Sequence, residues 1–164
     1  MATSTKTMVT ALKSTWNMQC AEIVFNYGQV GDMSSEDYHL IGQLTVPANS
    51  YISDVQVHGV TLWASGAAVS MIVGDGDDDN GLYVATNLKS GGELTAGEVL
   101  AFNHDGGQKG SYVTDDDGKL GGYSSSARTI IADITVTTHA TAATAGETRV
   151  LVMYCCPPSD SVKP

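Results

Sequence analysis

Short apolar stretches separated by turns constrain this chain more than any other feature of the sequence. The clearest are TIIADITVTT at 129–138 and ETRVLVMYC at 147–155, which HATAATAG joins with a closing glycine. Segments rich in Val, Ile and Thr, bounded by turn residues, are typical of β-strands. We therefore expect these two segments to be strands and to form a hairpin with each other.

Similar stretches recur along the rest of the chain. Ala21, Ile23 and Phe25 alternate with more polar neighbours, which is the two-residue period of a strand. Five further strands are expected at 39–46, 51–63, 67–73, 82–86 and 99–102. No long amphipathic helix pattern interrupts them. About eight short strands with turns between them predict an all-β fold, a single-domain, jelly-roll-like β-sandwich.

The segment 51–63 has apolar residues on both faces of the expected strand. Val55, Val57 and Trp63 fall on one face, whereas Ile52 and Val60 fall with Leu62 on the other. This mixture predicts a central strand or a bend near Gly59.

The ends of the chain differ from the middle in composition. Residues 1–18 form a Thr/Ser-rich arm whose charges are Lys6 and Lys13, residues 19–156 form the sandwich, and residues 157–164 form a short polar tail after two prolines. The arm is interpreted either as a floppy terminus or as a segment that becomes ordered on a partner.

Residues 103–128 are rich in Gly, Asp and Ser and poor in apolar residues. A loop of this length in a compact domain is typically functional or disordered. We expect either a long polar loop or a small hairpin anchored by Tyr112, Val113 and Leu120.

The charge balance excludes several classes of partner. Lys and Arg number 8 and Asp and Glu number 18, which gives a net charge of −10. A chain with this charge is not expected to bind nucleic acid or an anionic membrane surface. No segment is long and apolar enough for a signal peptide or a membrane span. The number of cysteines is odd and two of them are adjacent, so no disulfide framework is expected. Cys20, Cys155 and Cys156 are therefore interpreted as reduced thiols in a protein made in a cytoplasm.

The turn at 74–81 holds the strongest candidate for a metal site. Asp75, Asp77 and Asp79 stand at alternate positions, as the oxygen ligands of calcium loops do. Gly81 falls one residue late for that pattern, however, and no Glu occupies the twelfth position. The alternative is a solvated turn in which Asp is favoured for its backbone geometry. The sequence favours the turn and leaves calcium open.

Other potential sites lack the spacing that their chemistry requires. The sequence therefore predicts no enzyme, no catalytic residue, no resident metal and no cofactor. The residues considered are His39, His58, His104 and His139, without metal-ligand spacing; Ser124–Ser126, without a nucleophile elbow; Gly118–Lys119, without a phosphate loop; the weaker acidic cluster Asp115–Asp117; and the acid pair Asp54 and Glu98, expected by chance.

Three stretches resemble the head decoration, or cement, proteins of tailed bacteriophages. They are VPANSYISDVQVHGVTLW, SMIVGDGDDDNGLYVAT, and ELTAGEVLAF together with the terminal IIADITVTTHATAATAGETRVLVMY. The resemblance implies a jelly-roll-like or related β fold on the outside of an icosahedral shell, without catalytic residues. It also implies dimers or trimers that bridge capsid subunits. The polar region 103–128 has no counterpart in this resemblance.

We therefore expect a structural virion protein on the outer surface of a phage capsid, made in the host cytoplasm. Its expected partners are the major capsid protein and copies of itself, a homotrimer being favoured over a dimer. The expected contact regions are residues 1–18, 47–50 and 103–128. The alternative is a carbohydrate- or receptor-binding β module of a fibre or spike, in which Tyr112 and Tyr123 would be exposed binding residues.

Overall fold

The computed structural model describes residues 17–30, 37–64, 68–92, 94–102, 108–114, 123–137 and 143–156. Within these ranges the chain forms nine strands, one 3-10 turn and one short helix. No helix in these ranges is long and apolar enough to cross a membrane. The predicted all-β class is confirmed.

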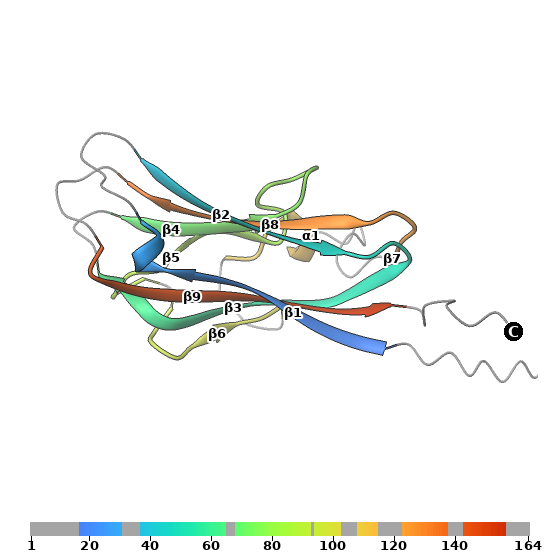
Figure 1. The fold of residues 1–164 in the computed structure, drawn as a ribbon, viewed down its shortest axis with the longest axis horizontal. Helices are drawn as coiled ribbons and strands as arrows, with labels where there is room; N and C mark the ends of the chain where they lie inside the picture. The colour runs from blue at the N-terminus through green and yellow to red at the C-terminus, as the bar shows by residue number, and fades with distance from the viewer. Residues whose placement is uncertain are drawn as a thin grey trace, which may run out of the picture.

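The strands form two facing antiparallel sheets, seen as two layers in Figure 1. Sheet A has the order β1-β9-β3-β6, with β7 also paired to β3, and sheet B has the order β2-β8-β4-β5. This arrangement is the predicted jelly-roll-like sandwich. The bounds in sheet A are β1 Asn17–Asn26, β9 Ala145–Cys156, β3 Ser50–Ala64, β6 Val99–Leu100 and β7 Tyr123–Ser124; those in sheet B are β2 Tyr38–Val46, β8 Arg128–Val136, β4 Val69–Gly74 and β5 Tyr83–Asn87.

The core lies between the sheets because alternate side chains of each strand point inward. Ile130 and Ile134 of β8 and Val150 and Val152 of β9 are fully buried. Each of these strands is central in its own sheet, which explains why their alternation is so clear in the sequence.

The expected hairpin between 129–138 and 147–155 is wrong. β8 pairs with β2 and β4, whereas β9 pairs with β1 and β3, so the two strands lie in different sheets. Alternation specifies which face of a strand is buried, but it does not specify the neighbouring strand. The residues between the strands are too many for a tight turn to impose pairing. Because facing sheets are only ~10 Å apart, a connection of this length can also pass from one sheet to the other.

Strand β3 departs from the predicted division of its faces. The register with β9 shifts between Ile52 and Asp54, and again after Gly59. The extra residue of a bulge reverses the alternation, so Ile52 is buried on the same side as Val55 and Val57. The predicted irregularity near Gly59 and the central position of the strand are confirmed.

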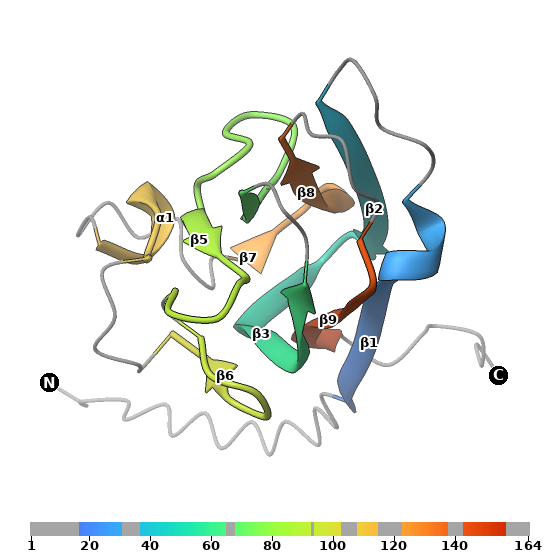
Figure 2. The ribbon, with the colours of Figure 1, turned by 90° about the vertical axis from the view of Figure 1, so that its left-hand side faces the viewer.

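Residues 108–114 contain a helical turn and no strand of the small hairpin, which was one of the two expectations for 103–128. Tyr112 and Val113 belong to α1 (Ser111–Thr114), one helical turn that lies beside β5 in Figure 2. Tyr112 nevertheless anchors the segment, since it is 5% exposed and packs against Gly81. Leu120 lies outside the described residues, as do residues 1–16 of the arm and the tail 157–164.

One side of the sandwich is closed by contact between β1 and β2. Ile23 and Phe25 of β1 lie over Gly42 of β2, where a Cβ atom would be 2.8 Å from Phe25 Cζ. Only glycine lets the two strands approach so closely. The first half of β1 lies away from β2, toward the right of Figure 1.

Candidate contact surface

The Asp turn between β4 and β5 is built around the carboxylate of Asp75. Its Oδ1 accepts hydrogen bonds from the backbone N–H of Asp77 at 3.0 Å and of Asp78 at 3.2 Å, and from the Tyr112 hydroxyl at 2.9 Å. Its Oδ2 accepts from Arg128 Nη2 at 3.1 Å. Burial alone would raise the pKa of Asp75, but these four hydrogen bonds outweigh it and lower the pKa below its usual value.

The other acids of the turn do not converge with Asp75 on one point. Asp78 accepts from Ser111 Oγ at 2.8 Å, whereas Asp77 and Asp79 are exposed. No group of three or more His, Cys, Asp or Glu among the described residues is arranged to hold a metal ion. The turn is a clamp that ties the end of β4 to α1 and to the start of β8.

A row of exposed side chains crosses the outer face of sheet A at one end. Directly paired residues of antiparallel strands share a face, and the pairs are Met18 with Cys155, Cys155 with Tyr51, and Tyr51 with Tyr123. Met18 is 68% exposed, Tyr51 44% and Tyr123 61%. We name Met18, Cys155, Tyr51 and Tyr123 the cross-sheet row.

The turn after β2 holds one end of this row in place. Asn49 has φ of 61°, a left-handed conformation that Asn tolerates better than most residues. Its N–H donates to Ser124 O at 2.7 Å, and its Oδ1 accepts from the Tyr123 hydroxyl at 2.7 Å. The short strand β7 and Tyr123 are thereby fixed against the start of β3.

The row contains residues of two of the three expected contact regions, Met18 from 1–18 and Tyr123 from 103–128. Asn49 of the turn 47–50 lies beside it, hydrogen-bonded to Tyr123. Residues 108–114 of region 103–128 lie elsewhere, beside β5. Asn17, which precedes the row, pairs with Cys156, so β1 begins and β9 ends beside it. The sequence did not point to Tyr51 or Cys155, whose outward direction depends on the β3 bulge and on the pairing of β9.

The same face changes character away from the row. Cys20 pairs with Met153 in the next position, which extends the sulfur-rich area. Beyond it, Arg149 donates to Glu147 at 2.8 Å and lies 3.5 Å from Glu22. The row is therefore the apolar and aromatic end of a face that is charged farther along.

The histidines and the acid pair occupy separate places. His39 lies 3.0 Å from Asp133 on sheet B, whereas His58 pairs in register with Arg149 on sheet A. Asp54 accepts hydrogen bonds from the Gln56 side chain and the Phe102 backbone, and Glu98 accepts from the Thr95 backbone and hydroxyl. His104, His139, Asp115–Asp117 and Gly118–Lys119 lie outside the described residues.

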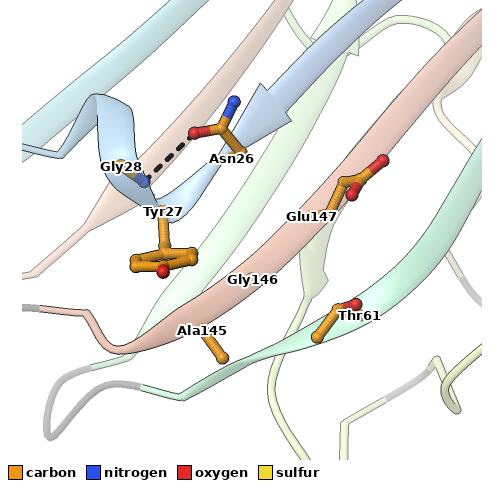
Figure 3. Close-up of a pocket in the computed structure, with 7 residues that line it drawn as sticks. All are labelled: Asn26, Tyr27, Gly28, Thr61, Ala145, Gly146 and Glu147. Atoms are coloured by element: carbon orange, nitrogen blue, oxygen red, sulfur yellow. Dashed lines mark hydrogen bonds between the residues drawn. The ribbon is translucent and has the colours of Figure 1, made fainter.

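A shallow hollow of about 280 Å³ lies at the opposite end of sheet A, shown in Figure 3. Tyr27, which is 45% exposed, stands at its edge, and the Asn26 side chain accepts from the Gly28 N–H at 3.1 Å. The sequence did not predict this hollow. Its lining residues are Asn26, Tyr27, Gly28, Thr61, Ala145, Gly146 and Glu147.

Comparison with known proteins gives matches in structure alone. No protein-family model matches the chain, and no curated protein matches it. A chain of the cyanophage Pam1 capsid asymmetric unit is similar over 88% of this chain and 86% of that chain, with 14% identity and a TM-score of 0.51. The acidic stable capsid structure of Helicobacter pylori bacteriophage KHP30 is similar over 87% and 95%, with 11% identity and a TM-score of 0.41. At such identities the likeness to the Pam1 chain establishes a shared fold.

Proposed function

We propose that this chain is a structural protein of a phage virion that binds the outer surface of an icosahedral capsid and stabilises the shell by bridging its subunits. The fold shared with a chain of the Pam1 capsid asymmetric unit over 88% of the length carries the proposal. The resemblance of the sequence to cement proteins supports the finer role. The proposed partners are the major capsid protein and further copies of this chain.

The cross-sheet row has the chemistry of a protein contact. Tyr and Met are enriched at the centres of interfaces, and Tyr supplies contact area at a low cost in side-chain entropy. The row is small, so one copy would bind weakly. Many symmetric copies on a shell compensate, because each bridge between subunits raises the effective concentration of the next contact.

The charge of the chain suits the outer side of a shell. With a net charge of −10, the molecule is repelled by packaged nucleic acid and remains attached only through local contacts. Such a role requires neither catalysis nor a cofactor. The three free cysteines agree with synthesis in the host cytoplasm.

Electron microscopy of the parent particle tests the location. We expect density for the chain on the outside of the head, bridging neighbouring capsid subunits. Density inside the head, or on the tail alone, would refute the proposal.

Binding of the purified chain to heads that lack it tests the surface. The variant Tyr123→Ser is expected to bind heads more weakly than the unmodified chain while melting at a similar temperature. The matched control is Tyr27→Ser, which removes an exposed tyrosine from the opposite end of sheet A. Equal binding by both variants would exclude the cross-sheet row as the contact.

The alternative function is carbohydrate or receptor binding by a fibre or spike module. The hollow beside Tyr27 favours it, since an exposed aromatic ring next to polar groups suits a sugar. Tyr112, one of the two tyrosines expected to bind, is instead buried. A glycan array in which Tyr27→Ser abolishes a specific signal would support this alternative over the capsid role.

A further inference from the structure

Strand β1 is an open edge of sheet A. It pairs with β9 without interruption from Asn17 to Asn26, and β9 is its one neighbour in the described sheet. Its second half is closed by contact with β2 at Gly42. Its first half is different, since Asn17–Cys20 is exposed at every position, including those that point toward the sandwich interior.

Within the described residues, this edge lacks the devices that normally prevent strands from pairing with other molecules. Such devices are short length, Lys or Pro residues, bulges, or a covering segment. β1 is ten residues long, contains no Lys, Arg or Pro, and has no register shift against β9. It contains one charged residue, Glu22.

The edge strands β5, β6 and β7 are protected. β6 and β7 are two residues long. β5 has a register shift against β4. Residues 108–110 also cover this edge, because the Val84 N–H donates a hydrogen bond to Gln108 O at 2.8 Å and the Gly110 N–H donates one to Leu82 O at 2.9 Å. The edge of β2 is approached by Ile23 and Phe25 at its middle residue, Gly42. The first half of β1 is therefore an open edge, longer than β6 and β7 and without the cover that β5 has.

The charge of the chain argues for a second copy as the occupant. Two copies with a net charge of −10 each repel one another over most of their surfaces. Asn17–Ala21 is uncharged, so here the repulsion between two copies is smallest. When an identical strand pairs antiparallel about Cys20, Glu22 lies opposite Met18 of the second copy rather than opposite a second Glu22.

We propose that β1 pairs antiparallel with β1 of a second copy of this chain, through main-chain hydrogen bonds along its open first half. Such pairing is self-complementary about a two-fold axis, the commonest symmetry of homo-oligomers. The product is a dimer with one continuous sheet, in place of the trimer that the resemblance to cement proteins favours. The inference names the self-partner of the proposed virion protein, although the pairing itself requires no shell.

Sedimentation equilibrium of the full chain tests the pairing. We expect a mass twice the 17.1 kDa of one chain. Gln19→Lys places one positive charge from each copy at the shared edge and is expected to return the mass to one chain, while circular dichroism shows that the chain is still folded. The matched control is Gln43→Lys, which makes the same change at an exposed position on β2 and is expected to leave the dimer intact.

Cross-linking through Cys20 provides a second measurement. In a Cys155→Ser, Cys156→Ser chain, Cys20 is the remaining thiol. Mild oxidation is expected to give a covalent dimer on a non-reducing gel, and adding Gln19→Lys is expected to remove it.

Three results would overturn the inference: a monomer at every concentration, an oligomer that Gln19→Lys leaves intact, or an oligomer that only Gln43→Lys dissociates. The test is independent of the capsid role. A monomer that still binds phage heads refutes the dimer alone, and a β1-linked dimer that is absent from heads refutes the capsid role alone.

Discussion

Removal of the Asp75 carboxylate should loosen the clamp that joins three segments of the fold. Asp75 is 11% exposed and its partner Arg128 19%, so this ion pair is largely shielded from water. Asp75→Ala removes the acceptor of the Arg128 guanidinium, of the Tyr112 hydroxyl and of two backbone N–H groups. Hydrogen bonds to charged groups contribute ~1.5–3 kcal/mol each, but water can replace some of them after the change. We expect a loss of about 3 kcal/mol in the free energy of unfolding.

The effect should depend on pH in a definite direction. The pKa of Asp75 is lower in the folded chain than in the unfolded chain, where a carboxyl of this kind titrates near ~3.9. The stabilising contribution is therefore complete above that value and is lost as the pH falls through the folded pKa. The difference between the unmodified chain and Asp75→Asn should be large at neutral pH and should shrink in strong acid.

Thermal and urea unfolding followed by circular dichroism measure both effects. A loss of about 3 kcal/mol corresponds to a melting temperature lower by ~6–12 °C for a chain of this size, provided that unfolding is two-state. Asp79→Asn is the matched control, since Asp79 is exposed in the same turn. An equal loss in the control, or a difference that pH does not change, would refute the reasoning.

Three further predictions concern the core and the same turn. Gly42→Val should destabilise the fold by roughly 1–3 kcal/mol in urea unfolding, because its side chain collides with Ile23 and Phe25 of β1; a neutral result would mean that the two edges are not in contact. Gly146→Ala should cost a similar amount and shift the tryptophan fluorescence, because its φ of 150° disfavours a side chain and its Cβ would be 2.8 Å from Trp63 Cε3. Calcium or EDTA should leave the melting temperature unchanged, because the oxygens of Asp75 are already engaged by donors of the chain; a calcium-dependent rise of several degrees would contradict this.

Local features of the fold could be predicted from the sequence, whereas the pairing of strands could not. Alternation placed the strands at 39–46 and 51–63 within about a residue of their observed bounds. It gave no neighbour for β8 or β9, because the choice of partner depends on packing between segments distant in the chain. The bulge after Ile52 could not be predicted from the sequence either, since it appears only in the register with β9.

The candidate surface could be predicted only in part, because it also depends on how the strands pair. The turn 47–50 and Tyr123 stood out by composition, and the structure places them side by side through Asn49. Tyr51 became recognisable as a surface residue only once the direction of β3 was known. Tyr112 was expected to be exposed, but Gly81 provides the space in which its ring packs, and Asp75 accepts a hydrogen bond from its hydroxyl.

The β1 pairing and the cross-sheet row reinforce each other geometrically. An antiparallel pair of identical strands has its two-fold axis perpendicular to the sheet, so both outer faces point to the same side. With the axis near Cys20, Met18 of one copy lies four positions from Met18 of the other, about 13 Å at ~3.3 Å per residue. The two rows would then form one contiguous patch around the axis. A doubled patch offers twice the contact area of a single row, and larger buried area is what distinguishes specific interfaces from weak contacts. Dimerisation through β1 would thus convert a weak contact of one chain into a surface able to bridge two subunits of a shell.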